Sequence, residues 1–187
     1  MALGKEVAAN QFPQVYQDLG IDPNKLGCIM LNTEPIEISN VIQFDDLYFS
    51  DPLLHPHTQG IICEDIPHVT LLYGLLRSGL ELKKHVDALL EGWEPADPTI
   101  REIGFFPGED ENNKYITLVA KLEASPNLLD ANSRLRLLPH CDTHQTYQPH
   151  ITLAYISDSS DYQGYIRTLN HMFMGMAVRA ANLNYGD

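Results

Sequence analysis

The sequence contains few cysteines and few basic residues, and each shortage excludes a class of protein. The three cysteines are odd in number, widely spaced and outside any CxxC pattern, so no disulfide framework is expected. Cys28, Cys63 and Cys141 are instead interpreted as small buried residues in a reducing compartment. Only 12 Lys and Arg accompany 25 Asp and Glu, which gives a formal net charge of −13. This charge disfavours a DNA or RNA duplex as a partner, although a few directed donors can still hold a small nucleotide.

Long apolar runs are also missing. No run approaches the roughly 18 apolar residues of a membrane span, and the N-terminal stretch MALGKEVAANQFPQ lacks the apolar core of a secretory signal. These features predict a cytoplasmic protein without a membrane partner. With 187 residues, of which 44% are hydrophobic, the chain has the size and composition of one globular domain.

One hydrophobic phrase occurs twice in the chain. It is PHVTLLYG at Pro67–Gly74 and PHITLAYI at Pro149–Ile156, and the two histidines are 82 residues apart. This interval is too long for a solenoid, whose repeats have periods of about 20–50 residues and need several copies. Two copies therefore predict two similar half-domains.

The remaining pattern favours an α+β fold. Each phrase is expected to form a strand, and further strands are predicted at residues 26–31, 99–106, 114–123 and 174–185, with a strand or hairpin at 41–50. Helices are predicted at residues 5–19, 78–93, 125–138 and 161–173. We expect a bilobal domain, in which two pseudo-twofold-related lobes of antiparallel strands line a central groove and carry their helices on the outside.

Each repeated strand carries two polar residues that share a face. Side chains alternate along a strand, so His68 lies beside Thr70 and His150 beside Thr152, and the alternation is expected to continue through each phrase. A histidine and its threonine would be roughly 6.6 Å apart along the strand, a separation at which both can contact one tetrahedral anion. Because histidine titrates near neutral pH, one imidazole can accept a proton while the other donates one. The four residues thus predict acid–base cleavage of a phosphodiester without a metal or other cofactor.

The two phrases match the H-Φ-T-Φ signatures, in which Φ is apolar, and the chain resembles the 2H phosphoesterase superfamily of LigT-like proteins with two HxT motifs. By element order the resemblance covers a core of about residues 26–185 within one domain of residues 1–187, so residues 1–25 are interpreted as an N-terminal extension. The resemblance implies that His68 and His150 are the acid and base and that Thr70 and Thr152 bind the phosphate.

The region of the second motif most resembles the phage anti-CBASS group of the superfamily, which destroys cyclic oligonucleotide signals. The resemblance and the acidic charge together suggest a small nucleotide, such as a cyclic oligonucleotide with 3′-5′ linkages, as the substrate. Tyr147, three residues before the second motif histidine, is a candidate for stacking on a base, and packing on the protein is an equally good interpretation.

Several alternatives stay open at this point. The enzyme could be a 2′,3′-cyclic or 2′-5′ RNA phosphodiesterase, or the chain could be a nucleotide-binding sponge without turnover. A zinc site built from His55, His57, His140 and His144 is disfavoured, because their spacing matches no strong zinc pattern. The sequence does not determine the oligomeric state.

Overall fold

The computed structural model describes residues 18–22, 25–48, 66–107, 115–142 and 146–186. Most of the helix predicted at residues 5–19 lies outside these ranges. Cys63 and three of the four histidines of the zinc hypothesis, His55, His57 and His144, also lie outside the described residues.

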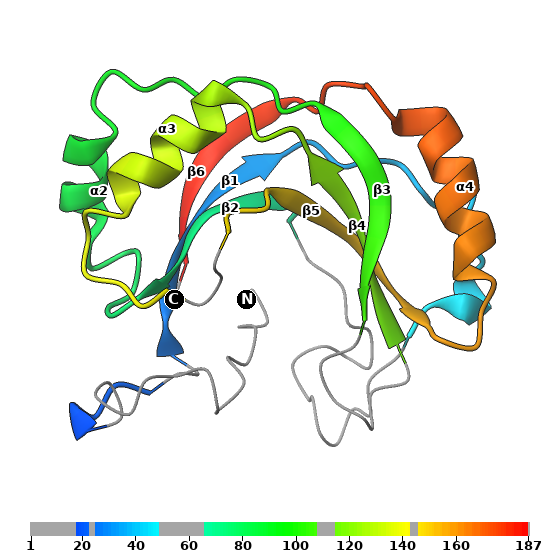
Figure 1. The fold of residues 1–187 in the computed structure, drawn as a ribbon, viewed down its shortest axis with the longest axis horizontal. Coiled ribbons are helices and arrows are strands. Elements are labelled where there is room, and N and C mark those ends of the chain that lie inside the picture. The colour runs from blue at the N-terminus through cyan, green and yellow to red at the C-terminus, as the bar shows by residue number, and fades with distance from the viewer. Residues whose placement is uncertain (1–17, 23–24, 49–65, 108–114, 143–145, 187) are drawn as a thin grey trace.

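The described chain forms two antiparallel sheets of three strands each, and with their helices these make an α+β fold, as predicted (Figure 1). Sheet A has the order β2-β1-β6 and contains His68–Leu75, Gly27–Thr33 and Ala180–Gly186. Sheet B has the order β3-β4-β5 and contains Ile100–Pro107, Tyr115–Leu122 and His150–Ser157. Each repeated phrase therefore supplies an edge strand of its sheet, β2 in sheet A and β5 in sheet B.

The α-helices lie on the convex side of the arch that the strands form (Figure 1). They are α2 (Lys83–Leu89), α3 (Pro126–Leu135) and α4 (Tyr162–Phe173). Helix α3 contacts β2 of sheet A, and α4 contacts β3 of sheet B. Capping residues fix where two of the helices begin, since the side chain of Ser125 accepts from the N–H of Leu128 and that of Asp161 accepts from the N–H of Gly164.

Three local predictions differ from the structure. The strand or hairpin predicted at residues 41–50 instead contains the 3-10 turn η2 (Phe44–Asp46), followed by a single bridge from Leu47 to Ile156. Helix α2 is shorter than the predicted 78–93, and β6 begins at Ala180 although a strand was predicted from residue 174. Apolar spacing favoured the longer elements, but it does not specify where backbone pairing begins and ends.

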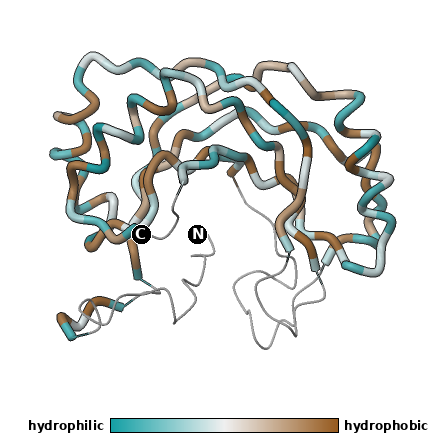
Figure 2. The backbone as a smooth tube through the Cα atoms, in the orientation of Figure 1, coloured by the Kyte–Doolittle hydropathy of each residue, from teal (hydrophilic) through white to brown (hydrophobic). Residues whose placement is uncertain are grey.

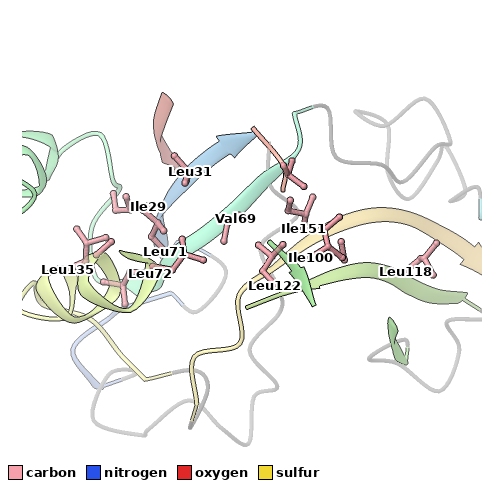
Figure 3. Packing of buried hydrophobic residues seen from close by; sticks show 14 of the residues in the cluster. Ile29, Leu31, Val69, Leu71, Leu72, Ile100, Leu118, Leu122, Leu135 and Ile151 are labelled. Carbon is pink, nitrogen blue, oxygen red and sulfur yellow. The ribbon is translucent and has the colours of Figure 1, made fainter. Parts of the chain in front are cut away.

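One continuous hydrophobic core joins the two sheets. Polar and apolar residues alternate along much of the backbone (Figure 2), and most of the buried apolar side chains of both sheets and of the helices gather in one cluster. Val69 of β2 and Ile151 of β5 are fully buried in this cluster (Figure 3). Strands β2 and β5 also contact each other, so the two repeated phrases meet where the sheets join (Figure 1). The core holds the two phrases in a fixed relation.

Candidate active site

The histidines of the two phrases occupy matching positions in the fold. His68 is the first residue of β2 and His150 the first residue of β5, and both are partly exposed. Their successors Val69 and Ile151 are fully buried. We call the face of each sheet that carries the histidine and threonine the motif face, and the opposite face, which packs against the helices, the core face.

The same hydrogen bond orients both imidazole rings. Nδ1 of His68 lies 3.0 Å from the carbonyl oxygen of Ile66, and Nδ1 of His150 lies 2.9 Å from the carbonyl oxygen of Gln148. In each case the acceptor is two residues earlier in the chain. A carbonyl can only accept, so this contact selects the tautomer that carries its hydrogen on Nδ1. Nε2 is then the nitrogen whose lone pair can take a proton from a substrate.

The backbone before each histidine is held in the same way. The carbonyl of Pro67 accepts from the N–H of Thr33, and the carbonyl of Pro149 accepts from the N–H of Leu122, both at 2.9 Å. A proline has no N–H to donate, so it suits the entry of an edge strand.

Each histidine also has a polar neighbour directly across from it on the central strand of its sheet. Asn32 of β1 is opposite His68, and Lys121 of β4 is opposite His150. Directly opposite residues of an antiparallel pair share a face, so both neighbours lie on the motif face.

A β-bulge follows each threonine at the same position. Thr70 pairs with Met30 and Leu72 with the adjacent Ile29, so Leu71 is the extra residue of β2. In sheet B, Thr152 pairs with Val119 and Ala154 with the adjacent Leu118, so Leu153 is the extra residue of β5.

The bulges overturn the prediction that side-chain alternation continues through each phrase. Beyond the bulge the order of faces reverses, so Leu72 and Ala154 lie on the core face and are 5% and 4% exposed. Beyond the bulges, Tyr73 of β2 and Tyr155 of β5 therefore lie on the motif face.

The buried side chain of Asn132 supports the first bulge. From helix α3, its Nδ2 donates to the carbonyl oxygen of Leu71 at 2.6 Å, and the residue is 8% exposed. The bulged residue cannot pair regularly with β1, and this bond gives its carbonyl a partner inside the protein.

The motif face of sheet B contains functional candidates that the sequence did not reveal. Register places Glu102, Gly104 and Phe106 of β3 on this face together with Lys121 of β4. Nζ of Lys121 lies 3.0 Å from a carboxylate oxygen of Glu102, and this ion pair lowers the pKa of Glu102. The ring of Phe106 meets that of His150 edge to face, with centroids 5.1 Å apart. These residues are far apart in the sequence, and only the β3-β4-β5 register brings them together.

Aromatic rings extend along the same sheet. The rings of Tyr48 and Tyr115 are 4.9 Å apart, and those of Tyr115 and Tyr155 are 5.6 Å apart. The register of β4 and β5 places Tyr115 and Tyr155 on the motif face. Tyr48, Tyr115 and Tyr155 are partly exposed, and a row of such rings is suited to contact with nucleobases.

Tyr147 packs against the hydrophobic core. Its hydroxyl is buried and has no hydrogen-bond partner among the described residues, and burial raises the pKa of the phenol above its ordinary value. Stacking of this ring on a substrate base stays a prediction.

The described residues contain no group of three or more side chains suited to hold a metal ion. His140 is the one histidine of the zinc hypothesis within them. Its Nδ1 lies 2.8 Å from the carbonyl oxygen of Leu138, and its Nε2 lies 3.5 Å from a carboxylate oxygen of Asp142. Within the same ranges, no helix is long and apolar enough to cross a membrane.

Comparison with known protein families gives a match over more than half of the chain. The profile of the 2′-5′ RNA ligase superfamily matches residues 63–174, a range that includes both repeated phrases. A comparison with curated proteins finds no match.

Proposed function

Because the chain belongs to the 2′-5′ RNA ligase superfamily and is a phosphodiesterase-type enzyme, we propose that it cleaves the 3′-5′ phosphodiester bonds of small, cyclic oligonucleotide signals. The observation that carries the proposal is the repeated local geometry of the two phrases. Each supplies a histidine oriented through Nδ1 and a threonine on the same face, directly before a bulge.

In the proposed reaction the two histidines divide the proton transfers. Nε2 of one imidazole removes the proton from the nucleophile, either water or the neighbouring ribose 2′-hydroxyl. The second imidazole, initially protonated, gives its proton to the departing oxygen on the opposite side of phosphorus. One proton is taken and one is given, so the exchange needs no proton from elsewhere. A pseudo-twofold relation between the lobes, with the substrate in a central groove, would place the imidazoles on opposite sides of the phosphate.

Thr70 and Thr152 are the proposed phosphate binders. Their hydroxyls would donate to the non-bridging oxygens and stabilise the charge that grows on them in the transition state. The same bonds would hold the nucleophile, phosphorus and leaving oxygen in line. In this scheme the catalytic residues are His68, Thr70, His150 and Thr152, and none of the steps requires a metal or cofactor.

The preference for a small nucleotide rests on charge and on the aromatic rings. A formal net charge of −13 repels a long polyanion, whereas a short ligand needs only local donors. The rings of Phe106, Tyr115 and Tyr155 on the motif face of sheet B offer surfaces for bases. The resemblance of the second motif region to the phage anti-CBASS group supports a counter-defence role.

The test is to incubate the protein in EDTA with cyclic di- and trinucleotides, 2′,3′-cyclic AMP and 2′-5′ oligoadenylate and to separate the products by chromatography. Loss of the cyclic oligonucleotides supports the proposal. Selective opening of 2′,3′-cyclic AMP, or cutting of the 2′-5′ chain, would instead assign the enzyme to RNA-end processing. Binding without any product identifies a nucleotide sponge, and activity that EDTA abolishes contradicts the metal-independent mechanism.

A further inference from the structure

Lys121 differs from its counterpart in the repeated geometry. The residue across from His68 is the neutral Asn32, whereas the residue across from His150 is a cation. In a chain with only 12 Lys and Arg, this places a positive charge on a motif face. The two phrases therefore have the same backbone geometry, but only the second has a positively charged residue opposite its histidine.

The ammonium group of Lys121 is directed away from His150. A Cβ atom on Gly104 would lie 2.8 Å from Cε and 3.0 Å from Nζ of Lys121, so the end of the lysine extends over this glycine. Gly104 belongs to β3, and β4 separates β3 from the histidine strand β5. Adjacent strand backbones are about 4.8 Å apart, so the backbone beneath the ammonium group is roughly 10 Å from that of β5, and the ring of His150 reaches across to Phe106 on the same strand β3.

The surroundings hold the lysine in this position. Glu102 contacts Nζ at 3.0 Å, and the side chain of Lys121 is 29% exposed. The missing side chain at Gly104 provides the space over which the lysine extends. Glu102 thus holds the ammonium group in place while part of the lysine side chain stays open to solvent. An ammonium group in this setting can bind an anion that approaches along the motif face.

We propose that Lys121, positioned by Glu102 and Gly104, binds the phosphate next to the one that His150 and Thr152 hold. This inference rests on the proposed function and specifies its substrate class as nucleotides with at least two phosphates. Nζ extends over Gly104 and contacts Glu102, both on β3, and this direction away from the histidine strand favours a neighbouring phosphate over the reacting one. The aromatic rings on the same face would contact the base between the two phosphates.

The experiment compares ligands that differ by one phosphate. The dinucleoside monophosphate ApA has a single phosphate, and its 5′- and 3′-phosphorylated forms have a second one on either side. Affinities are measured by calorimetry in a His68→Ala background, and KM and kcat are measured with the native enzyme. We expect at least one phosphorylated form to bind about tenfold or more tightly than ApA, since a hydrogen bond between charged groups contributes at least that factor.

Lys121→Met should remove this preference and leave the affinity for ApA unchanged. Gly104→Val should have the same effect without removing the charge, because its side chain would occupy the space of Cε and Nζ. The colliding atoms are the flexible end of a lysine, so this variant should fold, which circular dichroism checks. Lys84→Met removes an exposed lysine on α2 and serves as the matched control that keeps the preference.

Each result has a definite meaning. If Lys121→Met lowers the affinity for all three ligands equally, Lys121 lies at the reacting phosphate. If it lowers the affinity for none of them, Lys121 has no role in binding. Either result overturns the inference. Failure of the proposed function is separate, because native enzyme that turns over no nucleotide could still show the preference for a second phosphate in the binding measurement.

Discussion

Leu71 and Leu153 are the extra residues of two β-bulges, and each follows directly after the threonine of a repeated phrase. A bulge changes which face the following side chains occupy, so the same backbone irregularity brings Tyr73 and Tyr155 to the motif face of the two sheets. The two phrases thus share the position of a β-bulge as well as the order of their residue types. Such agreement is expected when two strands perform equivalent tasks.

The proposed acid–base pair predicts that His68→Ala and His150→Ala each lower kcat by about 10²–10⁴-fold, the usual contribution of a positioned proton donor or acceptor. Both side chains are partly exposed, so the variants should keep the native circular dichroism spectrum. His140→Ala is the control, since its Nδ1 makes the same contact with a carbonyl two residues earlier but lies outside both phrases. An active variant of either motif histidine would refute the assignment.

Replacing the threonines tests their role as phosphate binders. Thr70→Ala or Thr152→Ala should lower kcat by about 10²-fold or more, because each removes a donor to a transition-state oxygen. Thr→Ser at either position retains the hydroxyl and should recover most of the rate. Steady-state kinetics on the substrate identified by chromatography makes the comparison, and equal rates for the Ala and Ser variants would argue against a hydroxyl contact.

Asn132 is expected to be important for stability. Asn132→Ala leaves the buried carbonyl of Leu71 without its donor, and this should lower the free energy of unfolding by about 1–3 kcal/mol. Urea denaturation followed by circular dichroism measures the change. Ser133→Ala, at the exposed neighbouring position of α3, should change stability by less than about 0.5 kcal/mol. Similar values for the two variants would contradict the importance of the bond.

The buried phenol of Tyr147 predicts a loss of stability in alkali. Burial raises its pKa in the folded protein, so the unfolded chain loses this proton first. The stabilisation is complete below the ordinary tyrosine pKa of about 10 and is lost progressively as the pH rises above it.

Tyr147→Phe should weaken this dependence between about pH 10 and 12, as measured by thermal unfolding at a series of pH values. At neutral pH the substitution should change stability by less than about 1 kcal/mol, because the hydroxyl has no partner among the described residues. If the ring stacks on a base, Tyr147→Phe keeps the affinity for substrate and Tyr147→Ala lowers it. An unchanged pH profile in the Phe variant would contradict the burial argument.

The sequence predicts the elements of this fold better than their fine geometry. An apolar run identified β1, two segments separated by the turn-like PGEDENN identified β3 and β4, and Ser125 marked the start of α3. The bulges at Leu71 and Leu153 could not be predicted, because an extra apolar residue in an apolar run leaves no signal in the pattern. The four motif residues were found because they are repeated. Phe106 and Lys121 were missed because neither lies in a repeated phrase and both depend on strand register.

The order of strands in sheet A has a consequence for synthesis on the ribosome. Strand β1 pairs with β6, and this pairing brings together Asn32 and Asn184, which are 152 residues apart in the chain. All three strands of sheet B leave the ribosome before β6 does, so sheet B can form while sheet A still lacks its third strand. During that interval the open edge of β1 is available to other strands. Nascent chains released before residue 180 should therefore depend on chaperones more than the complete chain does.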